Sequence, residues 1–125
     1  DRIVVGEVRG PEVVELLMAL NTGHEGGCGT IHANSAEAVP ARLAALGLTA
    51  GIDRLALHAL IGSGLDAVIH LSRSGGQRYI DGVHVLDFSP QGLVTTRAAL
   101  TRRGDSWIKE SGWTDLENRC KDAAA

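Results

Sequence analysis

Apolar and polar positions in the first part of the chain follow a strand pattern and then a helix pattern. Residues 2–8 hold a β-branched apolar run, which predicts a buried strand. Pro11 follows at a position suited to the first turn of a helix, where its missing N–H leaves no bond unmade. Apolar side chains then recur at helical spacing, and Gly23 stands where a glycine commonly ends a helix.

The same order repeats directly afterwards. Residues 28–33 predict a second short strand, and Asn34 with Glu37 three residues later resembles a capping box. We therefore expect a second helix to begin at Asn34. Pro40 lies inside its pattern and predicts a distorted first turn, and Gly47 is expected to close the helix.

One more helix and then a series of strands follow from the remaining pattern. Residues 52–61 have the apolar spacing of a helix. Residues 66–73 and 78–88 read as two strands joined by a Ser-Gly-Gly turn, and a third strand is expected at 93–99 after a Ser-Pro-Gln-Gly turn. Residues 114–125 predict a weak helix or a disordered tail.

The alternation of strand and helix predicts an α/β fold with a parallel core, and the later hairpins predict an antiparallel extension. We expect three parts: the α/β core over residues 1–65, the strand and hairpin extension over 66–103, and a weakly structured tail over 104–125.

Composition adds bounds to this picture. The chain has 125 residues, a net charge of −3, 44% hydrophobic and 22% charged residues, which exclude general disorder and give no broad attraction to nucleic acid or anionic lipid. No apolar run approaches the roughly 18 residues of a membrane-spanning helix. The length excludes a complete large motor, and Asp1 in place of a methionine suggests a start inside a longer protein. Trp107 and Trp113 are expected to be packing residues, and the two cysteines to be reduced.

The first candidate for chemistry is Glu7, which follows an apolar strand. Nucleotide-hydrolysing α/β proteins place an acid in this position beside magnesium and phosphates. Arg9, two residues later, is expected on the same face. A carboxylate at the end of a strand is also an ordinary structural feature, and by itself the pattern favours that interpretation.

The second candidate is the segment 22–36, which carries His24 and His32 around a glycine-rich turn. Glycine allows close backbone approach to a ligand, and histidine can contact a phosphate or orient water. Each histidine alone would more simply be a structural residue.

Two other kinds of site are weaker alternatives. His24, Cys28 and His32 could hold zinc, but they supply only three ligands, and the intervening glycines disfavour the helix that would bring them together. Cys28 and His32 would stand roughly 13 Å apart on a strand, too far for a nucleophile and its base.

Taken together, these segments resemble the type II/IV secretion ATPase family. Residues 1–10, D-R-I-V-V-G-E-V-R-G, resemble its Walker B segment, and residues 22–36 followed by Arg42-Leu43 resemble its His box. Residues 66–73 are similar to a later strand of the family. The form of the His box is most similar to the conjugal transfer and Tad/Flp pilus assembly branch, and the resemblance extends to about Leu86.

The resemblance implies a fold and a set of roles. The fold would be the C-terminal part of a RecA-like P-loop NTPase core in a hexameric, cytoplasmic motor, peripheral to the inner face of the bacterial membrane. Its cofactors would be ATP and Mg²⁺, with Glu7 holding the metal through water. His24 and His32 would lie near the γ-phosphate and the subunit interface, and Arg9 would have an ionic or interface role at the nucleotide site.

The implied partners are further copies of the protein and inner-membrane secretion or pilus platform proteins, without sequence-specific binding of nucleic acid. The motor would couple ATP hydrolysis to pilus assembly, protein secretion or conjugal DNA transfer.

Departures from the family pattern restrict the expected activity. The sequence contains no G-x-x-x-x-G-K-[ST] phosphate loop, and Gly10 stands where many relatives carry Asp. We therefore expect that this chain alone neither binds ATP tightly nor hydrolyses it. The alternative to an ATPase part is a truncated, non-catalytic remnant that acts as a binding or assembly module. A Walker A motif encoded upstream in the same reading frame would favour the ATPase.

Overall fold

The computed structural model describes residues 2–125, so Asp1 of the predicted Walker B segment lies outside the described residues. Ten elements follow in the order β1 (Val4–Val5), α1 (Val13–Asn21), β2 (Cys28–Gly29), α2 (Val39–Leu48), α3 (Arg54–Gly64), β3 (Val68–Ser74), β4 (Gln77–Phe88), β5 (Val94–Arg103), β6 (Ser106–Lys109) and α4 (Trp113–Ala124). No helix of the described residues is both long and apolar enough to cross a bilayer.

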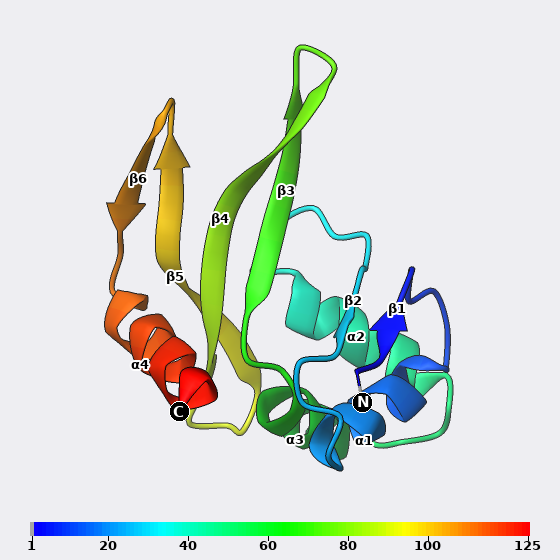
Figure 1. Cartoon of the computed structure of the whole chain (residues 1–125). Helices are drawn as coiled ribbons and strands as arrows, with labels where there is room; N and C mark the ends of the chain where they lie inside the picture. The colour runs from blue at the N-terminus through cyan, green and yellow to red at the C-terminus, as the bar shows by residue number, and fades with distance from the viewer. Residues whose placement is uncertain (1) are drawn as a thin grey trace.

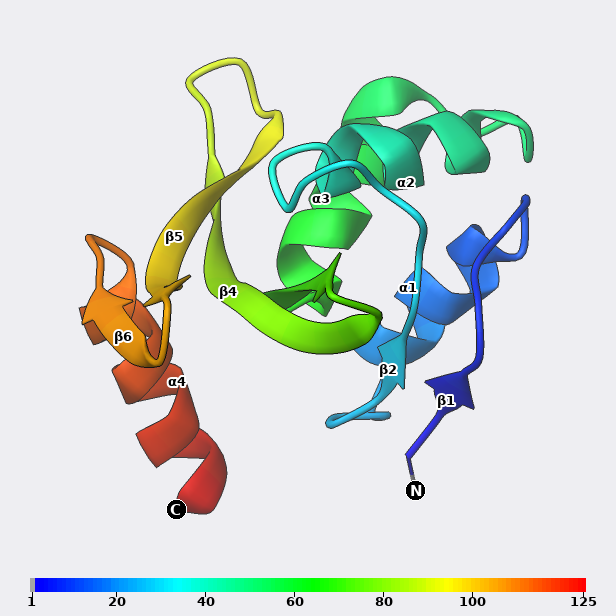
Figure 2. The ribbon, with the colours of Figure 1, turned by 90° about the horizontal axis from the view of Figure 1, so that it is seen from above.

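Two sheets organise the chain. β1 and β2 form a two-stranded parallel pair, and β3, β4, β5 and β6 form a four-stranded antiparallel sheet in that order. Helices α1, α2 and α3 lie on one side of the larger sheet, and α4 packs on the other side (Figures 1 and 2). This mixture of a parallel pair and an antiparallel sheet confirms the predicted α/β class.

One apolar core joins the three N-terminal helices to the larger sheet. Its buried side chains include Leu17 of α1, Leu57 and Ile61 of α3, and Leu86 of β4. His58 of α3 is also buried, and its Nδ1 accepts a hydrogen bond from the Val94 backbone N–H at 2.9 Å. Burial lowers the pKa of His58, which favours the neutral ring that this bond requires.

The N-terminal strands are shorter than the sequence pattern predicts. The expected buried strand over residues 2–8 forms ladder pairs only at Val4–Val5, and the Val4 side chain is 73% exposed. The expected strand over 28–33 is reduced to Cys28–Gly29. β-Branched residues favour extended backbone, but burial needs a packing partner on each face, and none of the described residues covers Val4.

The predicted capping box at Asn34 is wrong. α2 begins at Val39, and the turn before it is held by the Ser35 hydroxyl, which accepts from the Ala38 N–H at 3.3 Å. Pro40 then lies in the first turn, where its missing N–H causes no loss. The helix therefore starts where proline fits best, rather than being distorted by it.

The C-terminal part contains more structure than expected. β6 was not predicted. Residues 113–124 form the helix α4, which is the first of the two alternatives expected for residues 114–125, and none of its residues is fully buried. Trp113 is half-buried, as expected of a packing residue, whereas Trp107 is 46% exposed.

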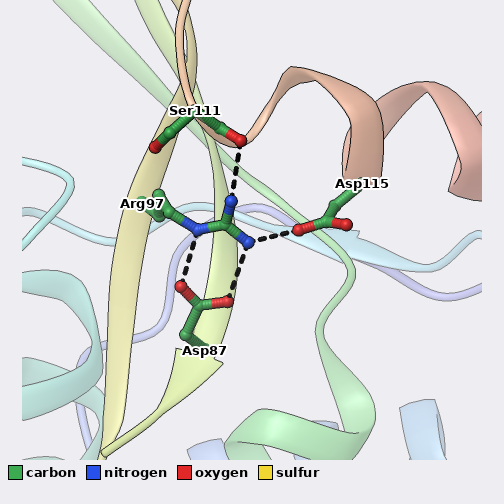
Figure 3. A network of polar contacts seen from close by, with 4 residues as sticks. All are labelled: Asp87, Arg97, Ser111 and Asp115. Atoms are coloured by element: carbon green, nitrogen blue, oxygen red, sulfur yellow. Dashed lines mark hydrogen bonds and ion pairs between the residues drawn. The ribbon is translucent and has the colours of Figure 1, made fainter.

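Arg97 of β5 attaches α4 to the sheet (Figure 3). Its guanidinium pairs with both carboxylate oxygens of Asp87, at 2.8 and 3.2 Å, and also donates to the Asp115 carboxylate and to the Ser111 carbonyl at 2.7 Å. Hydrogen bonding to Arg97 lowers the pKa of Asp87. One planar cation thus joins β4, β5 and the first turn of α4.

Substituting Arg97 by alanine is expected to release α4 from the sheet. Because no residue of α4 is fully buried, the helix depends on this network more than on apolar packing. We expect amide hydrogen exchange in α4 to accelerate about tenfold or more, without a comparable change in α3. Arg119→Ala, which removes only one exposed ion pair with Asp66, is the matched control and should have a smaller effect. Equal acceleration in both variants would contradict the assignment.

Candidate functional site

The parallel pairing of β1 with β2 places the segments that follow these two strands side by side. Val4 lies opposite Cys28 and Val5 opposite Gly29, and two backbone hydrogen bonds extend the pairing at either end. Before the ladder, the Cys28 N–H donates to the Ile3 carbonyl at 2.9 Å. Beyond it, the Val8 N–H donates to the Thr30 carbonyl at 2.8 Å. Because parallel strands end at the same edge, the residues that follow β1 and β2 meet there.

Glu7, Arg9 and His32 come together at this edge. Arg9 Nη2 lies 2.5 Å from Glu7 Oε2, and His32 Nδ1 lies 2.5 Å from Glu7 Oε1. The prediction that Glu7 and Arg9 lie on one face is confirmed by this contact. Glu7 is the most covered of the three, with 24% of its side chain exposed, whereas Arg9 and His32 are largely open to solvent.

The electrostatics keep Glu7 ionised. The hydrogen bond from Arg9 lowers its pKa below the ordinary value near 4.5, the bond from His32 adds to this effect, and partial desolvation opposes it. In turn, the Glu7 carboxylate raises the pKa of Arg9. Since an ionised carboxylate can only accept, the His32 contact requires a proton on Nδ1, and the Nε2 atom is left for another partner.

Substituting Arg9 by alanine is expected to raise the pKa of Glu7 toward its ordinary value, because the largest cause of the lowering is removed. The lowered pKa means that the interaction is present at neutral pH and is lost as the pH falls through that value. A pH titration of the Glu7 carboxyl carbon by NMR measures the shift. Arg103→Ala, at an exposed arginine on β5, should leave it unchanged. A lowered pKa that persists in Arg9→Ala would contradict the assignment.

An open pocket of about 430 Å³ surrounds the cluster, lined by Glu7, Val8, Arg9, His32 and Arg42. Arg42 comes from α2 and belongs to the pattern that resembles the His box, but the sequence did not predict that it lies at the site. The pocket thus combines one carboxylate with two arginines and a histidine. Such a set can hold an anion beside a cation that the carboxylate binds.

Glu12 shapes the backbone next to the pocket. Its Oε1 accepts from the backbone N–H groups of Arg9 and Gly10, both at 3.0 Å, and the bond from Arg9 lowers the pKa of Glu12. A side chain at Gly10 would meet the Glu12 carboxylate at 2.8 Å from its Cβ. The absence of a side chain at Gly10 therefore leaves room for Glu12 to fix the turn. Sequence reasoning missed this role of Glu12.

His24 is not brought to this cluster. It lies in the turn between α1 and β2, before the amino end of β2, and its Nδ1 is 3.2 Å from the Ala19 carbonyl oxygen. Glu7 and His32 lie beyond the opposite, carboxyl end of the parallel pair. The structure therefore joins three of the four predicted site residues and leaves His24 at the other edge.

The structure does not support the zinc alternative. Within residues 2–125, no group of three or more histidine, cysteine or acidic side chains is arranged to hold a metal ion. Cys28 is an exposed free thiol, and β2 ends at Gly29, so His32 does not share its strand. The alternative fails because the glycine-rich turn is not helical.

Comparison with known proteins identifies related sequences. Residues 1–110 match the family model described as "Type II/IV secretion system protein". A protein named for conjugal transfer in Mycobacterium tuberculosis (strain H37Rv) is 55% identical over 87 residues, covering 69% of this chain and 25% of the relative. The conjugal transfer protein TrbB of Rhizobium radiobacter is 42% identical over 86 residues, covering 68% of this chain and 26% of the relative.

A solved structure is similar as well. The VirB11 ATPase from the Brucella suis type IV secretion system, crystallised in complex with sulphate, superposes with a TM-score of 0.61 at 27% identity. The match covers 67% of this chain and 27% of that protein. The chain thus spans about a quarter of the length of the relatives that it matches.

Proposed function

The chain belongs to the type II/IV secretion system protein family, and on that premise we propose that it supplies the Walker B and His-box side of the ATP site of a secretion ATPase. The observation that carries this proposal is the cluster of Glu7, Arg9 and His32 at the carboxyl edge of β1 and β2. In α/β proteins this edge of a parallel sheet is where nucleotide phosphates bind. The VirB11 relative, itself an ATPase, supports the same assignment.

The residues of the pocket fit a nucleotide with its metal. Bound ATP and Mg²⁺ supply the phosphate bond to be cleaved and the neutralisation of its charge. Mg²⁺ keeps several waters and needs only one or two carboxylates, so the ionised and partly exposed Glu7 suits contact through water. Arg9 keeps that carboxylate charged. The contact of His32 Nδ1 with Glu7 fixes the orientation of the imidazole ring, and we assign this ring to the γ-phosphate. Arg42 is a further candidate for phosphate contact.

His24 receives a different role in this proposal. Its position at the far edge of the parallel pair separates it from Glu7, so we assign it to the interface with a neighbouring subunit rather than to the phosphate. The parallel pair and its helices would form part of a RecA-like core within a hexameric ring. Family membership and the VirB11 likeness support this arrangement.

The proposed work of the assembled motor is to couple ATP hydrolysis to conjugal DNA transfer, protein secretion or pilus assembly of the Tad/Flp kind. The names of the relatives support the first two. The motor would act in the cytoplasm at the inner face of the bacterial membrane, where inner-membrane platform proteins would be its partners.

A graft tests the proposal. The matched 87-residue segment of the Mycobacterium tuberculosis relative would be replaced by the corresponding residues of this chain, and ATP turnover measured on the purified hybrid. At 55% identity the grafted residues should pack, and we expect turnover within about tenfold of that relative's own. If the unmodified relative shows turnover, a folded hybrid that shows none would contradict the proposal and favour the non-catalytic module.

A further inference from the structure

The outer face of the β3–β4 hairpin exposes apolar side chains that the described chain does not cover. Ile69 and Leu71 of β3 are 57% and 58% exposed, and Ile80 of β4 is 40% exposed. Leu71 lies directly opposite Ile80 in the antiparallel register, so these side chains are neighbours on one face. We call Ile69, Leu71, Arg73, Arg78 and Ile80 the hairpin patch.

The register shows which side of the sheet carries the hairpin patch. Val68 packs against the core formed with α1, α2 and α3, so Ile69 and Leu71, which alternate with Val68 and His70 along β3, face the opposite side. That opposite side is where α4 packs, close to Val85. In Figure 1, α4 lies against the lower part of the sheet, whereas the hairpin of β3 and β4 extends well beyond it.

Two arginines complete the patch without a partner for their charge. Arg73 and Arg78 lie directly opposite each other across the hairpin, and both are exposed. Like charges in opposed positions destabilise a strand pair. Among residues 2–125, neither arginine forms an ion pair, although the chain is acidic overall. Apolar side chains beside an uncompensated pair of cations are what a surface that docks an acidic, amphipathic segment would present.

The lower half of the same face shows how such a segment is bound. There, α4 lies on the sheet with Trp113 half-buried, and its Asp115 accepts from Arg97. Lys109 also lies 4.7 Å from the centre of the Trp113 ring. The lower half therefore binds a helix through the close approach of its first residues to the apolar side chain of Val85 and through an arginine–carboxylate pair. The hairpin patch has the same two components and no helix.

We propose that the hairpin patch is a docking surface for an acidic amphipathic helix of a partner protein. The apolar stripe of that helix would cover Ile69, Leu71 and Ile80, and carboxylates beside the stripe would pair with Arg73 and Arg78. We favour a helix over an anionic bilayer because the lower half of the same face already binds a helix, α4, with an arginine–carboxylate pair. This surface is separate from the pocket around Glu7 and goes beyond the proposed function.

A selection from random displayed peptides tests the proposal directly. The probe is a library of peptides of about 16 residues, long enough for four helical turns. It would be selected on the purified chain and counter-selected on the Arg73→Glu, Arg78→Glu double variant. We expect enriched peptides to carry apolar residues at i, i+3, i+4 and i+7 with Asp or Glu beside them. One enriched peptide, synthesised and measured by fluorescence polarisation, should bind the double variant at least about tenfold more weakly than the wild type.

Matched variants separate the charge from the apolar contact. Arg103→Glu with Lys121→Glu changes the net charge equally but lies outside the hairpin patch, so binding should be retained. Leu71→Ser should weaken the peptide with both arginines intact. A peptide whose acids are replaced by lysine should prefer the double variant. Because only surface residues change, far-UV circular dichroism should be the same for all variants.

Four results would overturn the proposal. Enrichment that does not depend on the patch would remove it, and enriched peptides with strand alternation would assign the site to pairing with the edge of β3 instead. Sedimentation with phosphatidylglycerol vesicles that is lost in the double variant would assign it to a lipid surface. Concentration-dependent dimerisation lost in Leu71→Ser would assign it to a second copy of this chain.

Discussion

Glu7→Gln in the grafted hybrid should lower ATP turnover by about a hundredfold or more, the usual scale for removing a charge that stabilises the reacting groups. The amide keeps the shape of the side chain but cannot hold a hydrated metal ion as a carboxylate does. Arg9 and His32 would lose their charged partner at the same time. ATP binding, measured by displacement of a fluorescent analogue, should change much less than turnover.

Glu25→Gln is the control for this prediction. Glu25 is exposed in the turn next to His24, at the edge of the parallel pair away from the pocket, so turnover should stay close to that of the unmodified hybrid. Because both ion-pair partners of Glu7 are largely exposed, its replacement should also change the urea unfolding midpoint only slightly. Full turnover by a folded Glu7→Gln hybrid would remove Glu7 from the proposed chemistry.

Leu57→Ala should lower the free energy of unfolding of the chain by about 3 kcal/mol, within the range of about 2 to 5 found for buried leucines. Leu57 is 0% exposed and lies in the middle of the core, where α3 packs on α2. Truncation leaves a cavity that backbone atoms cannot fill. Urea unfolding followed by circular dichroism measures the change.

Gly47 of α2 faces Leu57, so a substitution at Gly47 also tests the packing of α2 against α3. A Cβ at Gly47 would lie 2.2 Å from Leu57 Cδ2, so Gly47→Ala forces a buried side chain to move. Overpacking costs about 1 to 3 kcal/mol, whereas alanine gains at most about 1 kcal/mol over glycine in a helix. We therefore expect Gly47→Ala alone to destabilise the chain.

The sign should reverse in the Leu57→Ala background. The colliding methyl groups are then gone, and the new methyl at position 47 fills part of the cavity. Gly47→Ala should stabilise that variant by about 1 kcal/mol, giving a coupling of about 2 kcal/mol between the two positions. Additive effects in the four-protein cycle would mean that α2 moves away from α3 instead of packing closely against it.

Local patterns predicted the elements that depend on local chemistry. The Gly75-Gly76 turn was found from its glycines, and both adopt positive φ, as a two-residue hairpin turn requires. β6 was missed although the Gly104-Asp105 turn and the residues Trp107 and Ile108 favour a hairpin, because Ser106–Lys109 is too short to show a clear alternation; its pairing with β5 completes the strand. The start of α2 was misplaced because the hydroxyl of Ser35, rather than the side chain of Asn34, makes the turn.

The candidate site also combines features that local patterns predict with features that depend on how distant segments align. The approach of Arg9 to Glu7 was predicted from two-residue alternation and is observed, although the ladder ends at Val5 and both residues lie beyond it. That His32 reaches Glu7 while His24 does not depends on how two short strands align, and spacing alone did not separate the histidines. The carboxylate of Glu12 bonds backbone N–H groups, and its sequence position does not distinguish it from a solvent-facing residue.

The brevity of the parallel pair has a consequence for dynamics. β1 and β2 share only two register pairs, whereas the antiparallel sheet is a long and mostly local ladder. Native-state hydrogen exchange should therefore show the strands beneath Glu7 and His32 opening far more often than β4, in a local fluctuation that leaves the sheet folded. A ligand that bridges the two loops would close this fluctuation, so part of its binding energy would go into ordering the site.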